Sequence, residues 1–152
     1  MLEMVQKAQD QLLHYPVSST GSDLKRIIRL LMGQKVAPKD GFNWPNGLLA
    51  KGLIDYYYAH QNSEEAREIL DCLRQYCDRF IRRKCKMYYL DDAVSGLALI
   101  ELHQITKDEK YRKAADEVAQ YLFQHETDDL GSLLYRPEQQ NGYIFADMIG
   151  MV

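Results

Sequence analysis

Apolar residues recur at intervals of three and four along most of the chain, which is the spacing of one face of an α-helix. The first such stretch covers residues 2–15 and stops before Pro16. A second covers residues 24–31 and follows Ser22 and Asp23, either of which can serve as its N-cap. The pattern therefore predicts two amphipathic helices near the amino terminus.

Four longer helices are expected further along, over residues 46–60, 63–83, 92–105 and 107–122. Asn62 with Glu65, and Thr106 with Glu109, have the spacing of a capping box, which predicts a helix start after each pair's first member. The helix over 92–105 is apolar around most of its circumference, so we expect it to be buried on several sides.

These four helices form a repeated pair. Six positions of the first pair match positions 45 residues later in the second pair: Ile54 with Leu99, Tyr57 with Leu102, Asn62 with Lys107, Glu64 with Glu109, Arg67 with Arg112 and Ile69 with Ala114. Helix pairs of this period build solenoids and closed α/α toroids. Gly47 and Gly52 lie in the first helix, where they lower its propensity but allow close helix approach. No segment of useful length alternates with period two, so an all-α fold is predicted.

The predicted organisation is a single domain over residues 1–152. We expect two amino-terminal helices and an irregular loop over 1–43, a first repeat over 44–83 and a second repeat over 91–125. The start of a further helix is expected over 143–152. Between the second repeat and that last helix, Gly131 to Tyr135 is expected to form a short strand or an extended loop.

Composition places the chain among globular proteins, with 46% apolar and 27% charged residues in 152. A net charge of −3 argues against a nucleic-acid partner, and no apolar run is long enough to span a membrane. Three cysteines without Cys-x-x-Cys spacing argue against a disulfide framework or a zinc site. The polar first ten residues do not form a signal peptide, so a cytoplasmic location is expected.

Three aspartates are candidates for chemistry. Asp91 and Asp92 precede the most apolar helix, where they either cap that helix or hold a carboxylate at the mouth of a pocket. Asp147 lies within the apolar run 144–149, where an isolated carboxylate is costly. Such a site raises the pKa of the carboxyl, which suits a general acid; Asp147 can equally begin the last helix.

Aromatic and basic residues supply candidates for binding. Trp44 precedes a helix, where its ring either joins the core or stacks on a sugar. Tyr89 and Tyr135 are candidates for lining a pocket because of the residues next to them in the sequence. The basic run 82–86 is either a solvated helix end or a source of attraction for an acidic substrate. The four histidines have no metal-ligand spacing, and no cysteine stands in an activating arrangement.

Several segments in order resemble the amino-terminal portion of the unsaturated glucuronyl and rhamnogalacturonyl hydrolases, glycoside hydrolase families 88 and 105. They are Phe42-Asn43-Trp44-Pro45-Asn46-Gly47-Leu48-Leu49, Leu90-Asp91-Asp92-Ala93-Val94-Ser95-Gly96, Thr106-Lys107-Asp108-Glu109-Lys110-Tyr111, Gly131-Ser132-Leu133-Leu134-Tyr135 and Ile144-Phe145-Ala146-Asp147-Met148-Ile149-Gly150-Met151. The resemblance runs through most of residues 40–152. It implies helical hairpins of an (α/α)6 toroid, incomplete in this chain, with about two and a half hairpins present.

The resemblance also implies an activity, which is hydrolysis of 4,5-unsaturated uronyl oligosaccharides, the products of polysaccharide lyases. The reaction begins by hydrating a vinyl ether. By position, Asp147 matches the general acid and base, and Asp91 matches the second aspartate, with Asp92 as the alternative. Trp44 matches an aromatic wall of the sugar site, and no metal or organic cofactor is implied.

Two departures leave the sugar specificity open. Tyr135 stands where many members carry histidine, and Pro45 with Asn46 stands where an aromatic or acidic residue is common. Two other functions compete: a non-catalytic helical-repeat interaction module, and another α/α-toroid carbohydrate enzyme such as a sugar epimerase. Because a partial toroid exposes the flanks of its inner helices, we expect self-association that covers the open side.

Overall fold

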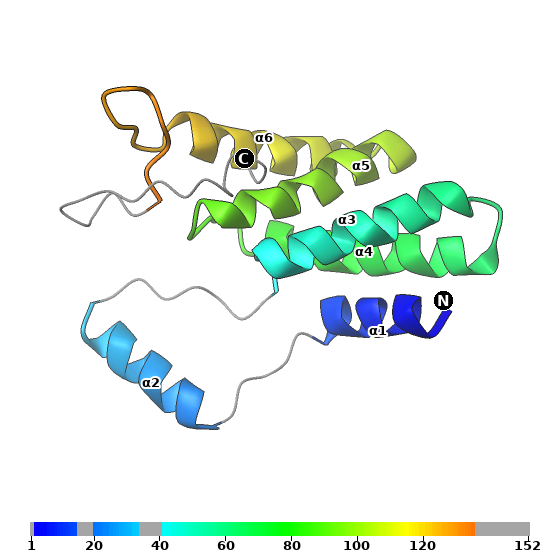
Figure 1. The fold of residues 1–152 in the computed structure, drawn as a ribbon, viewed down its shortest axis with the longest axis horizontal. Coiled ribbons are helices and arrows are strands. Elements are labelled where there is room, and N and C mark those ends of the chain that lie inside the picture. The colour runs from blue at the N-terminus through cyan, green and yellow to red at the C-terminus, as the bar shows by residue number, and fades with distance from the viewer. Residues whose placement is uncertain (1, 15–19, 34–40, 136–152) are drawn as a thin grey trace.

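The computed structural model describes residues 2–14, 20–33 and 41–135, and within them it is built from helices (Figure 1). The elements are α1 (Leu2–Leu13), α2 (Thr20–Leu31), α3 (Trp44–Ala59), α4 (Glu64–Arg82), the short 3-10 helix η1 (Asp91–Ser95), α5 (Gly96–Thr106) and α6 (Glu109–Phe123). The only pairing of strand type in these residues is an isolated antiparallel bridge between Thr127 and Leu133. The all-α prediction is confirmed, and Leu133, within the segment 131–135 expected to be a short strand or an extended loop, takes part in that bridge.

Two antiparallel helix pairs form the body of the structure. Figure 1 shows α5 and α6 stacked beside α3 and α4, with α1 against the far side of the first pair. Ser63 and Asp108, 45 residues apart, are the N-caps of α4 and α6. The repeat predicted from the sequence is therefore a structural repeat, with each pair turning at the same relative position.

The residues that cap these helices differ from those predicted. Ser63, and not Asn62, caps α4, since its Oγ accepts a hydrogen bond from the Ala66 N–H at 3.1 Å. Thr106 belongs to α5, where its Oγ1 donates to the Leu102 carbonyl at 2.6 Å. A capping residue must stand outside the helix in extended conformation, so a shift of one or two positions in the helix start decides which polar side chain caps it.

The core lies where α1, α3, α4, α5 and α6 meet. Its fully buried large side chains come from all five helices and include Leu12, Ile54, Ile69, Leu73, Tyr76, Phe80, Leu99, Leu102 and Tyr111. The guanidinium of Arg79 fastens α1 to α4 by donating to the carbonyls of Leu12 and Leu13. These are the last carbonyls of α1, which have no partner within the helix.

Two predictions of close packing were wrong in part. Helix α5 packs against α3, α4 and α6, as expected for a helix buried on several sides, but Leu97 and Ile100 are 42% and 45% exposed, so one of its faces stays open. A Cβ on Gly47 would lie 2.7 Å from Val94 Cγ1 and 2.8 Å from the Ser95 nitrogen, whereas a Cβ on Gly52 would meet nothing within 4 Å. Close approach therefore requires glycine at Gly47 and not at Gly52.

Helix α2 lies apart from the other helices in Figure 1. It begins at Thr20, earlier than the predicted cap at Ser22 or Asp23. Its large apolar side chains are exposed, from 46% at Ile28 to 82% at Leu31. Across the described ranges, no helix is both long and apolar enough to span a bilayer.

Candidate functional site

The site begins at the amino-terminal end of α3, where the chain needs a sharp entry into the helix. Asn43 has extended backbone and caps α3, with its side-chain oxygen accepting from the Asn46 N–H at 3.2 Å. The Asn46 amide in turn donates to the Gly41 carbonyl at 2.9 Å. Pro45 suits the first turn because the helix needs no N–H donor there. Trp44 is thereby held as the first residue of the helix.

Helix η1 brings two carboxylates to this end of α3. The Oδ1 atom of Asp92 accepts a hydrogen bond from the backbone N–H of Trp44 at 3.3 Å, across 48 residues of sequence. No side-chain capping bond is made at the start of η1 itself. Asp92 therefore serves the amino terminus of α3, where a carboxylate is favoured by the free N–H groups and the helix dipole.

A buried chain of hydrogen bonds holds η1 against α3. The Tyr76 hydroxyl donates to Ser95 Oγ at 2.9 Å, and Ser95 Oγ donates to the Asn43 carbonyl at 2.9 Å. Ser95 and Tyr76 are buried, and Gly47 lets the two backbones touch. Three elements are fixed together in this way, and Asp92 is aimed at Trp44 as a result.

Asp92 is only 6% exposed, and burial raises the pKa of its carboxyl to about 7. The charge of Asp91 acts in the same direction. The hydrogen bond from Trp44, the Arg83 guanidinium and a backbone hydrogen bond from Tyr89 oppose the rise in pKa. Burial thus favours the protonated form of Asp92 at a pH where an exposed aspartate is fully ionised.

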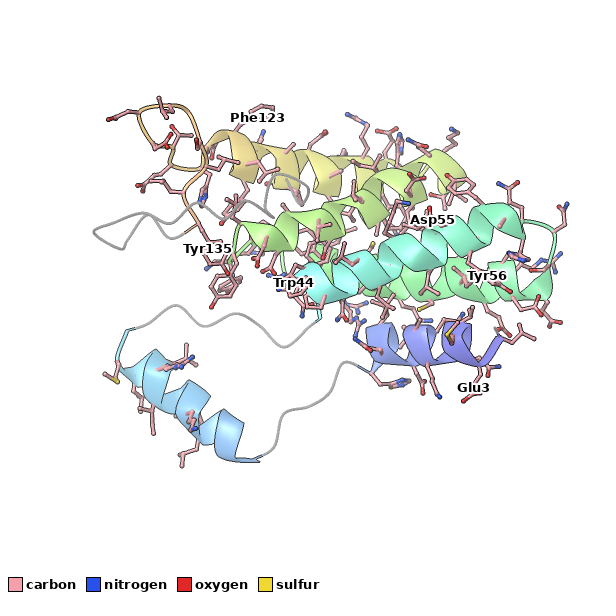
Figure 2. All side chains as sticks on the ribbon, in the orientation of Figure 1. Glu3, Trp44, Asp55, Tyr56, Phe123 and Tyr135 are labelled. Atoms are coloured by element: carbon pink, nitrogen blue, oxygen red, sulfur yellow. The ribbon has the colours of Figure 1, made fainter. Side chains whose placement is uncertain are left out.

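The other predicted side chains surround this acid at one end of the bundle. Trp44 is 42% exposed, so its ring is not a core residue. The Tyr135 hydroxyl donates to Asp91 Oδ2 at 3.4 Å, and Figure 2 shows Tyr135 and Trp44 at the same end of the bundle. Tyr89 is half-buried beside Asp91 in sequence. The structure brings together five of the predicted residues; the sixth, Asp147, lies outside the described residues.

Three residues that support the site were not predicted from the sequence. Ser95 and Tyr76 form the buried hydrogen-bond chain described above, and no local pattern marks them as partners. Arg83 lies with its guanidinium carbon 4.9 Å from the ring centroid of Phe80 and 5.6 Å from that of Tyr88. Its only signal in the sequence was membership of the basic run 82–86.

Within residues 2–14, 20–33 and 41–135, no group of three or more His, Cys, Asp or Glu side chains is arranged to hold a metal ion. Cys72 and Cys77 are buried, and Cys85 is half-buried. Burial raises the pKa of the Cys72 thiol to about 11, so this thiol stays protonated at neutral pH. The described part of the site is therefore one of carboxyl groups and aromatic rings.

This arrangement suits a sugar ligand. An exposed indole ring offers a flat apolar face to the C–H groups of a pyranose, while a protonated carboxyl beside it can donate a hydrogen bond. A carboxyl group with a pKa near the working pH is also suited to moving protons.

Comparison with known protein families gave a match. The family described as Glycosyl Hydrolase Family 88 matches residues 18–152, which includes every candidate site residue. No curated protein and no solved structure matches the chain.

Proposed function

We propose, because this chain belongs to glycosyl hydrolase family 88, that it hydrolyses oligosaccharides ending in a 4,5-unsaturated uronic acid. The match confirms the resemblance seen in the sequence and supports a glycoside-hydrolase-like function. The substrate and the hydration chemistry are the proposal. The observation that carries it is the buried acid Asp92, which lies against the amino terminus of α3 next to the exposed ring of Trp44.

The proposed reaction adds one water molecule across the C4–C5 double bond. An acid gives a proton to C4, and water gives its oxygen to C5 while its own proton passes to the carboxylate that results. The product is a hemiketal at C5, which opens by breaking the bond between C5 and the ring oxygen. The hemiacetal left at C1 then releases the linked sugar. The double bond is consumed, and the anomeric carbon is not attacked directly, unlike the common two-carboxylate schemes.

The roles of the residues follow from position and environment. We assign Asp147 as the acid and base, on its match to the family pattern. Asp91 is assigned to holding the sugar ring, with its Oδ2 atom oriented by Tyr135. Asp92, with its raised pKa, is the alternative for this second carboxyl role, because its protonated form donates to a sugar hydroxyl. Trp44 forms the aromatic wall, and Tyr89 and Tyr135 border the site.

Self-association belongs to the same proposal. Leu48 on α3 and Leu97 and Ile100 on α5 are between 42% and 49% exposed, and the apolar face of α2 is exposed as well. Exposed apolar area on neighbouring helices favours association. Light scattering behind a sizing column, over a range of protein concentrations, should show a species heavier than 17.7 kDa. A monomer at every concentration would contradict this part of the proposal.

The activity is tested by following the ultraviolet absorbance of the conjugated double bond. The substrates are disaccharides released by pectin lyases and by glycosaminoglycan lyases. We expect absorbance to fall with the wild-type protein and to stay constant with Asp147→Asn. Asp91→Asn and Asp92→Asn should lower the rate, while Asp129→Asn, an exposed aspartate in a turn, is the matched control.

Retained activity in Asp147→Asn would remove that residue from the mechanism. No fall in absorbance with any substrate, for protein whose circular dichroism is helical, would refute the proposed activity and favour an interaction module.

A further inference from the structure

We propose that the cleft between the end of α4 and the end of α6 binds an acidic oligosaccharide as an accessory site. This α4–α6 cleft has a volume of about 460 Å³ and is lined by residues 83–87 on one side and by Glu117, Gln120, Tyr121 and Gln124 on the other. The choice of an acidic sugar as the ligand rests on the proposed function. Apart from Arg83, the residues that line the cleft are not among those of the candidate site.

One side of the α4–α6 cleft is a tight turn with a defined shape. Lys84 and Cys85 both adopt left-handed backbone, with φ of 60° and 53°. Such a conformation costs about 1–2 kcal/mol per residue outside glycine, and here hydrogen bonds from the Cys85 N–H to the Phe80 carbonyl (3.2 Å) and from Arg83 to the Lys86 carbonyl hold it. The basic side chains therefore project from a constrained turn and not from a frayed helix end.

The charge of the cleft is opposite to that of the chain. Arg83, Lys84 and Lys86 contribute three positive charges against one negative charge from Glu117, whereas the whole chain carries −3. A local positive potential on an acidic protein attracts and orients anions. Because Lys84 and Lys86 are exposed, their ammonium groups are accessible to the carboxylates of a ligand.

The aromatic and amide groups of the cleft favour a sugar over a compact anion. Tyr121 is half-buried, and its ring is braced by His125, with ring centroids 5.2 Å apart. Gln120 and Gln124 are exposed beside it on the last turns of α6. A ring face for C–H groups, amides for hydroxyls and ammonium groups for carboxylates together match a chain of uronic acids.

The α4–α6 cleft also borders the candidate site. Arg83 lines the cleft and contributes to the electrostatic surroundings of Asp92. Its guanidinium lies over the rings of Phe42 and Tyr88. Phe42 precedes Trp44 by two residues, and Tyr88 precedes Asp92 by four. An acidic chain bound in the cleft would thus lie next to the elements that carry the site.

Binding is tested with oligogalacturonides whose residues are all saturated. They contain no vinyl ether, so binding is measured apart from turnover, and an inactive protein can still pass this test. We expect titration calorimetry to show binding that weakens roughly five- to tenfold in Lys84→Gln/Lys86→Gln, as expected for two exposed charge pairs. The matched control is Lys107→Gln/Lys113→Gln, which removes the same charge from exposed lysines outside the cleft.

Cys85 provides an independent readout inside the cleft. It is half-buried, while Cys72 and Cys77 are buried, so alkylation of the folded protein should modify Cys85 first. Burial raises the pKa of the Cys85 thiol, and the reaction is therefore run at mildly alkaline pH. Saturated oligogalacturonide should slow the modification.

Three results would overturn the proposal. They are the absence of binding to the wild-type protein, equal weakening in the control variant, and protection of Cys85 by tripolyphosphate equal to that by the oligosaccharide. The last result would identify a general anion site and remove the assignment to sugars.

Discussion

Replacing Asp92 with asparagine should make the protein more stable at alkaline pH. Asp92 is buried, and its carboxyl has a pKa of about 7 where the ordinary value is 3.8. Folding therefore favours the protonated form of this group. An asparagine side chain is neutral at every pH, has nearly the same shape, and keeps an oxygen that accepts the hydrogen bond from the Trp44 N–H.

The size of the effect follows from the difference between the folded and unfolded pKa values. Each pKa unit corresponds to about 1.4 kcal/mol, so Asp92 lowers the wild-type stability by about 4 kcal/mol once it is ionised. Below about pH 4 the group is protonated in both states and has no effect. Between about pH 4 and pH 7 the folded state binds a proton that the unfolded state has released, so the stability of the wild type falls as pH rises.

The assay is urea unfolding of the wild type and Asp92→Asn across that pH range, followed by far-ultraviolet circular dichroism. The difference in free energy of unfolding should be small near pH 4 and should grow to about 4 kcal/mol in favour of the variant by about pH 8. Asp129→Asn, at an exposed position, controls for the loss of one surface charge. A difference that does not change with pH would refute the conclusion that Asp92 is held protonated.

Two further predictions concern the contact between η1 and α3. Gly47→Ala should destabilise the fold by about 1–3 kcal/mol in urea unfolding, because its Cβ would collide with the Ser95 backbone, which cannot move aside. Gly52→Ala, the control, should leave the stability unchanged or raise it by up to about 1 kcal/mol. Equal effects of the two substitutions would contradict the close packing at Gly47. Ser95→Ala should cost about 1–3 kcal/mol, because the buried Tyr76 hydroxyl loses its acceptor. Combining Ser95→Ala with Tyr76→Phe should cost less than the sum of the two, and additive effects would mean that the two hydroxyls act independently.

Much of the fold was predictable because helices are stabilised within their own sequence. The period of the apolar residues predicted α1, α4 and α6 closely, since one buried face requires one side chain every three or four positions. The same reasoning overstated the burial of α5, which exposes Leu97 and Ile100. An apolar circumference shows that a helix can be buried on several sides, whereas burial itself depends on what packs there.

The candidate site was predictable in its members and not in its connections. Asp91, Asp92 and Trp44 were recognised by residue type and by resemblance, but the sequence left open whether Asp92 caps the following helix, and in the structure no side chain caps η1. The acid serves the amino terminus of α3, which is 48 residues away. Ser95 and Tyr76 were missed because a hydroxyl in a sequence does not show whether its partner is water or another buried group.

The helical class, the 45-residue repeat and the residues available for chemistry follow from the order of amino acids alone, because helix periodicity, capping preference and turn residues act over a few neighbouring positions. Packing of the helices is what brings Asp92 to the backbone of Trp44, raises the pKa of its carboxyl to about 7, and makes residues 83–87 line a cleft with α6. Those properties depend on desolvation and on charges brought together from distant segments. Desolvation and long-range charge interactions arise only when the helices pack.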